Sequence, residues 1–154
     1  MIIDVHAHLY PRAFMEEIAA HGPRHGVSLT ADAPPILCFE GIKFWPYAPA
    51  FHDVAVRLKA MDEAGCDWQV LSLGPPMIYW ADVELGLRLC RIFNDEIGRV
   101  VRAHPDRFVG FAAVPLQEPA RALGELERAV SGLGLRGVAV GSNIQGMQLD
   151  DPRL

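Results

Sequence analysis

Two histidines, one residue apart near the N-terminus, are the residues whose types and spacing could do chemistry. They belong to the segment Asp4-Val5-His6-Ala7-His8, where the first predicted strand (2–6) ends. Because alternate side chains of a strand point to the same face, His6 and His8 should project together, with Ala7 turned away. Two imidazoles at that spacing can both reach one cation, at ~2.0–2.1 Å if it is zinc. The pattern therefore predicts a pair of metal ligands.

This short pattern also has a second interpretation, in which both imidazoles only hydrogen-bond to backbone groups or water. The position of the two histidines favours metal binding, because the pair ends the first strand of a βα series. In a barrel, the carboxyl ends of the strands face the mouth of the active site. Asp4 is expected either to support one of the imidazoles from behind or to be an exposed carboxylate at the strand's start.

Strands alternate with helices along most of the chain, and these elements must position the pair. Val54, Leu58 and Met61 recur at helical spacing, and Gly65 stops the helix. Further strands are expected over 68–73, 108–114 and 135–140. One further helix is expected to end near His104-Pro105, with apolar positions at Leu85, Leu89, Ile92, Phe93, Ile97 and Val100. Another helix is expected with apolar positions at Leu123, Leu126, Val130 and Leu133. Residues at about 10–51, rich in Pro, Gly and His, are expected to be an irregular insertion with a short helix over 11–20.

The predicted strands are apolar on both faces, which is typical of a parallel sheet covered by helices. Their alternation with helices indicates right-handed βαβ units, and hence an α/β fold with about four parallel strands over residues 1–154. Either a doubly wound sheet or part of a barrel fits, although four units are too few to close a barrel of eight. The turn at 149–154 normally introduces another helix, so the sequence is expected to stop in mid-fold.

Composition excludes several classes of partner. The net charge of −5 and the scattered Lys and Arg argue against nucleic acid. No apolar run approaches the ~20 residues of a membrane span, and no secretory signal precedes the first strand. Cys38, Cys66 and Cys90 are odd in number and far apart, so reduced thiols in a cytoplasmic protein are expected.

Two other motifs do not support a function. Residues 132–137 match GxGxxG, but they follow a predicted helix and open a strand, the reverse of a dinucleotide site. Ser72 lies inside a predicted strand and has no GxSxG context, so serine hydrolase chemistry is not indicated.

Several segments taken together resemble the amidohydrolase-related group that includes aminocarboxymuconate-semialdehyde decarboxylase and resorcylate-type aromatic-acid decarboxylases. The matching segments, in the same order and over nearly the whole chain, are Ile3 to Pro11, Arg57 to Asp67, Gln69 to Ser72, His104 to Phe108, Gly110 to Ala112, Val114 to Gln117, Leu133 to Val138 and Leu149 to Pro152. The set is specific for the family and not for a substrate.

The resemblance implies the N-terminal half of a TIM-type (β/α)8 barrel with one divalent metal ion, zinc in the first place and manganese as the alternative. Two of its ligands fall on His6 and His8, whereas a further histidine, an aspartate and the catalytic residues are expected beyond Leu154. The implied activity is non-oxidative decarboxylation of a small aromatic or unsaturated carboxylic acid. The alternatives are metal-dependent hydrolysis of a small cyclic substrate and an inactive truncated fragment.

One departure from the family concerns the substrate. The decarboxylase named first has a Phe-Arg-Pro segment that meets the substrate carboxylate, whereas this chain reads Phe44-Trp45-Pro46. Trp45 can stack on an aromatic ring, or simply plug the insertion, but cannot pair with a carboxylate in bidentate fashion. The predicted substrate-binding residues are Trp45, Lys43 (as a point charge) and Met77, with Pro76 and Asn143 as further pocket wall. The expected partners are the small carboxylic acid and a second copy in a homodimer.

Overall fold

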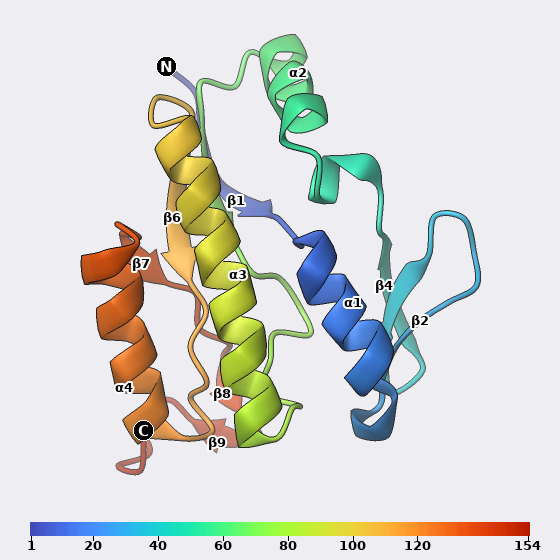
Figure 1. Cartoon of the computed structure of the whole chain (residues 1–154), viewed down its shortest axis with the longest axis vertical. Coiled ribbons are helices and arrows are strands. Elements are labelled where there is room, and N and C mark those ends of the chain that lie inside the picture. The colour runs from blue at the N-terminus through green and yellow to red at the C-terminus, as the bar shows by residue number, and fades with distance from the viewer.

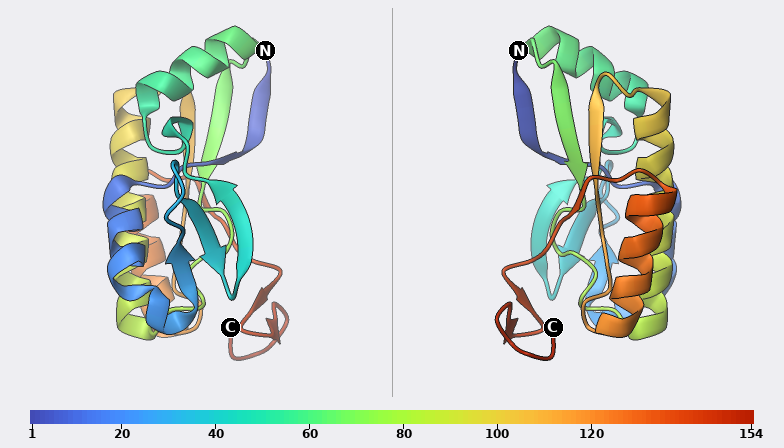
Figure 2. Two further views of the ribbon diagram at one scale, coloured as in Figure 1. Left: turned by 90° about the vertical axis from the view of Figure 1, so that its right-hand side faces the viewer. Right: turned by 90° about the vertical axis from the view of Figure 1, so that its left-hand side faces the viewer.

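A four-stranded parallel sheet forms the centre of the protein, described here from a computed structural model of residues 1–154 (Figure 1). Its strands are β1 (Ile3–His8), β5 (Trp68–Ser72), β6 (Phe108–Ala112) and β7 (Gly137–Val138), in the spatial order β1-β5-β6-β7. Figure 2 shows α1, α3 and α4 on one side of these strands and no helix on the other. The predicted α/β class with four parallel strands is confirmed.

Helix α2 (Val54–Ala64) begins and ends where the sequence predicts. The Asp53 carboxylate accepts hydrogen bonds from the first free amides of the helix, and Gly65 adopts a left-handed φ of 66° that ends it. Met61 from the predicted apolar stripe is buried. Helix α3 (Val83–Ala103) also follows its prediction, because it ends just before His104 and its apolar positions are buried, apart from Ile92, which is partly buried.

Helix α4 (Pro119–Glu127) differs from its prediction. Leu123 is 69% exposed and Val130 is 44% exposed, while Ala122, Glu125 and Ala129 face inward. The small alanines let α4 approach α3 closely, and a buried hydrogen bond of 2.7 Å joins Asn94 of α3 to Glu125. A π-helical turn (Arg128–Gly132) then interrupts the regular spacing. The predicted apolar stripe of this helix is therefore wrong.

The segment 10–51 is more ordered than the sequence indicated. It holds α1 (Arg12–His21), two 3₁₀ turns (Pro23–His25 and Pro49–Phe51), and an antiparallel sheet of β2 (Val27–Leu29), β3 (Ile36–Phe39) and β4 (Ile42–Pro46). Glu40 and Gly41 have left-handed φ values of 49° and 80° at the turn between β3 and β4. A second small hairpin near the C-terminus joins β8 (Asn143–Ile144) to β9 (Met147–Gln148).

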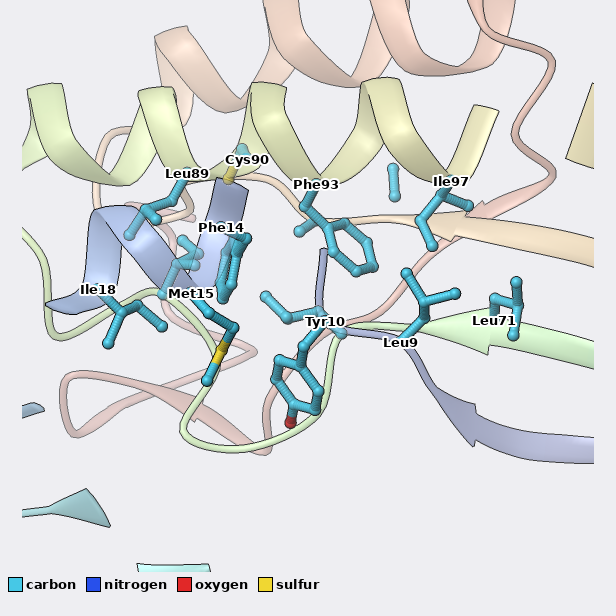
Figure 3. Close-up of a cluster of buried hydrophobic side chains, with 14 of the residues drawn as sticks. Leu9, Tyr10, Phe14, Met15, Ile18, Leu71, Leu89, Cys90, Phe93 and Ile97 are labelled. Carbon is cyan, nitrogen blue, oxygen red and sulfur yellow. The ribbon is translucent and has the colours of Figure 1, made fainter. Parts of the chain in front are cut away.

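The main core lies between the sheet and the helices α1 and α3. In Figure 3, Phe14 and Ile18 of α1 and Leu89 and Phe93 of α3 point toward one another, beside Tyr10. This packing fixes the chain directly after β1, because Leu9 and Tyr10 are both 1% exposed. None of the helices combines the length and apolar character that a membrane crossing requires.

Replacing Asn94 should destabilise the fold strongly. Its side chain donates to the Ala113 carbonyl and to Glu125, and it accepts from the Ala113 amide, with all four groups buried. Asn94→Ala leaves the buried carbonyl and amide of Ala113 unpaired, whereas Glu125 keeps its hydrogen bonds from Arg128. The free energy of unfolding should therefore fall by about 2–4 kcal/mol in urea denaturation. Leu123→Ala on exposed α4 surface is the control and should change it by less than ~0.5 kcal/mol. Equal effects of the two variants would contradict this account.

Candidate metal centre

The two imidazoles predicted as ligands converge at the carboxyl end of β1. Their Nε2 atoms lie 3.1 Å apart, and the rings are tilted by 68° with centroids 4.7 Å apart. Two nitrogens that bind one zinc ion at ~2.1 Å lie roughly 3.0–3.4 Å apart for bond angles of about 90–110°. The separation therefore fits two ligands of one cation, and equally fits a hydrogen bond from one ring to the other.

Ser72 orients the His8 ring. It is the last residue of β5, in register with His8 on β1, and its Oγ lies 3.2 Å from His8 Nδ1 and 3.5 Å from the Ala7 carbonyl oxygen. If the hydroxyl donates to that carbonyl, its oxygen accepts from Nδ1–H, which leaves the lone pair on Nε2. Burial, followed by the neighbouring His6, lowers the pKa of His8 and favours the neutral ring that a metal needs.

No motif around Ser72 predicts this contact with His8, and from the sequence Ser72 is considered only as a possible nucleophile. A signal was available in its position. Ser72 ends the strand predicted to follow β1, so parallel pairing would place it beside the histidines. The pairing register, rather than any motif around Ser72, was the missing information.

Polar side chains behind β1 hold its backbone. Asp4 accepts from the His6 backbone amide at 3.0 Å and from Gln69 Nε2 at 3.0 Å, so it supports the strand and not an imidazole. Arg57 donates to Gln69 Oε1 at 3.0 Å and to the carbonyl oxygens of His8 and Ala50. The pairing register with β5 shifts between Asp4 and Ala7, so the irregular stretch of the ladder includes His6.

The His8 ring fits beside Gly74 because this residue has no side chain. A Cβ atom on Gly74 would lie 2.8 Å from two atoms of that ring and 2.5 Å from the Tyr10 hydroxyl. Trp45 lies on another side, with its ring nearly parallel to His8 at an angle of 16° and a centroid distance of 6.0 Å. The ring is thus confined by Ser72, Gly74 and Trp45.

The pair opens into a cleft of about 550 Å³, whose lining residues come from β1, β4, the end of β5 and the segment after β7. Of the predicted substrate-binding residues, Trp45 and Met77 line it, whereas Lys43 is exposed on β4 and does not. Pro76 and Asn143 line an adjoining cleft. No group of three or more His, Cys, Asp or Glu side chains is arranged to hold a metal ion, so His6 and His8 form the candidate centre by themselves.

Comparison with known proteins identifies the family. The amidohydrolase family model matches residues 3–154, and the chain belongs to this family. The 2-amino-3-carboxymuconate-6-semialdehyde decarboxylase of Dictyostelium discoideum is 34% identical over 155 residues, covering 99% of this chain and 43% of that protein. The predicted resemblance to this group of decarboxylases is therefore confirmed.

Solved structures give the same picture. 5-Carboxyvanillate decarboxylase from Sphingomonas paucimobilis matches with a TM-score of 0.78 and 31% identity, over 99% of this chain and 46% of that one. A dihydroxybenzoic acid decarboxylase from Polaromonas sp., solved with bound manganese and the inhibitor 2-nitroresorcinol, matches with a TM-score of 0.67 and 29% identity, over 92% and 39%. The chain thus spans less than half the length of these proteins, and the prediction of the N-terminal half of a TIM-type barrel is confirmed.

Adding one methyl group at Gly74 should disturb the His8 ring. Gly74→Ala is expected to lower the free energy of unfolding by about 1–3 kcal/mol, because the neighbouring rings must move. It should also shift the imidazole resonances of His8 in an NMR spectrum. Gly124→Ala on α4 is the matched control, since its Cβ meets nothing within 4 Å. It should stabilise the helix by up to ~1 kcal/mol and leave His8 unmoved. An unshifted His8 in Gly74→Ala would refute the confinement.

Proposed function

We propose that this chain is the metal-binding part of a metal-dependent decarboxylase that acts on a small aromatic or unsaturated carboxylic acid. The observation that carries the proposal is that the Nε2 atoms of His6 and His8 lie 3.1 Å apart at the carboxyl end of β1. Family membership and the decarboxylases among the similar proteins support the reaction class. The ion is zinc in the first place, with manganese as the alternative.

His6 and His8 would hold the ion, and Ser72 would keep Nε2 of His8 available for it. Once bound, a divalent ion polarises a carboxylate or an adjacent oxygen of the substrate. Trp45 offers a flat apolar surface against which an aromatic acid can stack, and Met77 adds a second apolar side chain to the lining of the cleft. Lys43 remains a prediction as a carboxylate contact, since it would have to reach the cleft from the exposed side of β4.

The reaction breaks the bond between the ring carbon and the carboxylate. The electron pair stays on the ring carbon, which takes up a proton as carbon dioxide leaves. Among the residues that line the cleft, only His6 and His8 titrate, and both are assigned to the metal. We therefore propose that the proton donor and the remaining ligands come from residues beyond Leu154.

Metal binding tests the first half of the proposal. Isothermal titration calorimetry with Zn²⁺ and with Mn²⁺ should give one site per chain, and the double variant His6→Ala/His8→Ala should abolish it. His104→Ala is the control, because His104 ends α3 away from the cleft and should leave the titration unchanged. Binding that survives in the double variant would place the ion elsewhere. No binding by the unaltered chain would show that two imidazoles alone do not form the site.

Carbon dioxide release tests the reaction class. With saturating Zn²⁺ or Mn²⁺, a protein that joins this chain to the proposed residues beyond Leu154 should be assayed with dihydroxybenzoates and 5-carboxyvanillate, with product detection by chromatography. Turnover should depend on the metal and fall at least ~10³-fold in His6→Ala, because the ion that polarises the acid is lost. Metal-dependent hydrolysis of a cyclic amide or lactone without any decarboxylation would overturn the assignment of the reaction.

A further inference from the structure

A second cleft adjoins the candidate metal centre. It has a volume of about 340 Å³ and shares Pro75, Met77, Gly141 and Ser142 with the cleft that contains His6 and His8. The two clefts therefore lie side by side and border the same four residues. Away from the shared residues, the second cleft is lined by Phe39, Phe44, Pro76, Tyr79, Trp80, Asn143 and Gln145.

None of the side chains that line the second cleft carries a charge. Four of its lining residues are aromatic, and its polar side chains are the hydroxyls of Tyr79 and Ser142 and the amides of Asn143 and Gln145. Small-molecule sites typically have this composition, with mostly apolar walls and a few polar groups that fix orientation. A group bound here would be planar or apolar, and uncharged.

Hydrogen bonds fix two of the three segments that form the walls. Trp80 donates from Nε1 to the Met77 carbonyl at 2.9 Å, which ties the loop after β5 to itself. Gln145 of the C-terminal hairpin donates to the Tyr79 carbonyl at 2.6 Å. Met77 has a left-handed φ of 59°, an unfavourable conformation for a residue with a side chain, and such residues cluster at ligand sites. The cleft is thus formed before any ligand arrives.

Phe44 supplies the third wall from β4. It is partly exposed and does not belong to the main core, unlike its neighbour Trp45, which packs against that core. The two rings lie 5.5 Å apart with an angle of 59° between them. Trp45 lines the first cleft and Phe44 the second, so these consecutive residues border both.

We infer that the two clefts bind one ligand, an aromatic acid longer than a single ring. Its acidic end lies at His6 and His8, and a second ring or an apolar substituent lies among Phe44, Met77 and Trp80. The acidic end of this inference rests on the proposed function, whereas the second subsite rests on the aromatic cleft alone.

The test compares three probes on the Zn²⁺-loaded chain by calorimetry: benzoate, 4-biphenylcarboxylate and the neutral 4-biphenylmethanol. 4-Biphenylcarboxylate should bind at least about tenfold tighter than benzoate, because its second ring is removed from water. Phe44→Ala should abolish most of that gain. Ile42→Ala is the matched control, since Ile42 lies on the same strand, is 64% exposed and lines neither cleft.

Failure of the subsite and failure of the proposed function give different results. Equal affinities for the two acids, no measurable binding of 4-biphenylcarboxylate, or equal losses in Phe44→Ala and Ile42→Ala would each overturn the subsite. His6→Ala/His8→Ala should weaken both acids and leave 4-biphenylmethanol unchanged. If the double variant weakens no acid while Phe44→Ala still removes the gain, the subsite stands and the metal-centred function is wrong.

Discussion

The buried guanidinium of Arg57 is the interaction on which the geometry of the candidate site depends. Only 8% of this residue is exposed, and it donates to the carbonyl oxygens of His8 and Ala50 and to the Gln69 side chain. Burial lowers the pKa of Arg57, while the nearby Asp4 carboxylate raises it. Burying a cation costs free energy unless its N–H groups are hydrogen-bonded. The carbonyl oxygens of His8 and Ala50 must therefore lie next to the Arg57 guanidinium.

That requirement joins segments that are far apart in sequence. Arg57 belongs to α2, His8 ends β1 and Gln69 lies on β5, whereas Ala50 lies in the 3₁₀ turn (Pro49–Phe51) that follows the small antiparallel sheet. Through Gln69 and Asp4 the same network reaches the His6 backbone amide. The backbones of both histidines are therefore held by this network, while Ser72 contacts the His8 ring itself. Strand alternation brings the two imidazoles to the same side, and the network fixes how close they come.

The parts of the structure that follow from local periodicity could be predicted from the sequence. Strand β1, helices α2 and α3 and the parallel sheet depend on apolar repeats and on Gly65, which act over a few residues. The exposed Leu123 could not be predicted, because the buried face of α4 is chosen by the hydrogen bond between Asn94 and Glu125. The spacing of apolar residues does not reveal that two polar side chains, Asn94 and Glu125, are buried and hydrogen-bonded to each other.

The residues of the candidate site also differ in whether the sequence could predict their position. His6 and His8 are separated by one residue, so a strand suffices to bring them together, whereas Ser72 reaches them only through parallel pairing. The strands β2, β3 and β4 are three to five residues long and lie among prolines, so their pairing leaves little trace in the sequence. The sequence feature that could have indicated the hairpin is Gly41, because a glycine readily adopts the left-handed conformation that the turn between β3 and β4 requires.

The two ends of the cleft are held by different kinds of interaction. The histidine end rests on buried, multiply hydrogen-bonded groups in regular strands, so substitutions there disturb the fold as well as the site. The outer walls belong to a small sheet, a loop and a hairpin, and single hydrogen bonds such as Gln145 to the Tyr79 carbonyl hold them. Such walls can change shape or sequence at little cost to the sheet. Under the proposed function, the histidine end would therefore be the less variable part of the cleft, and Phe44 and its neighbours would be the part in which the choice of acid could vary.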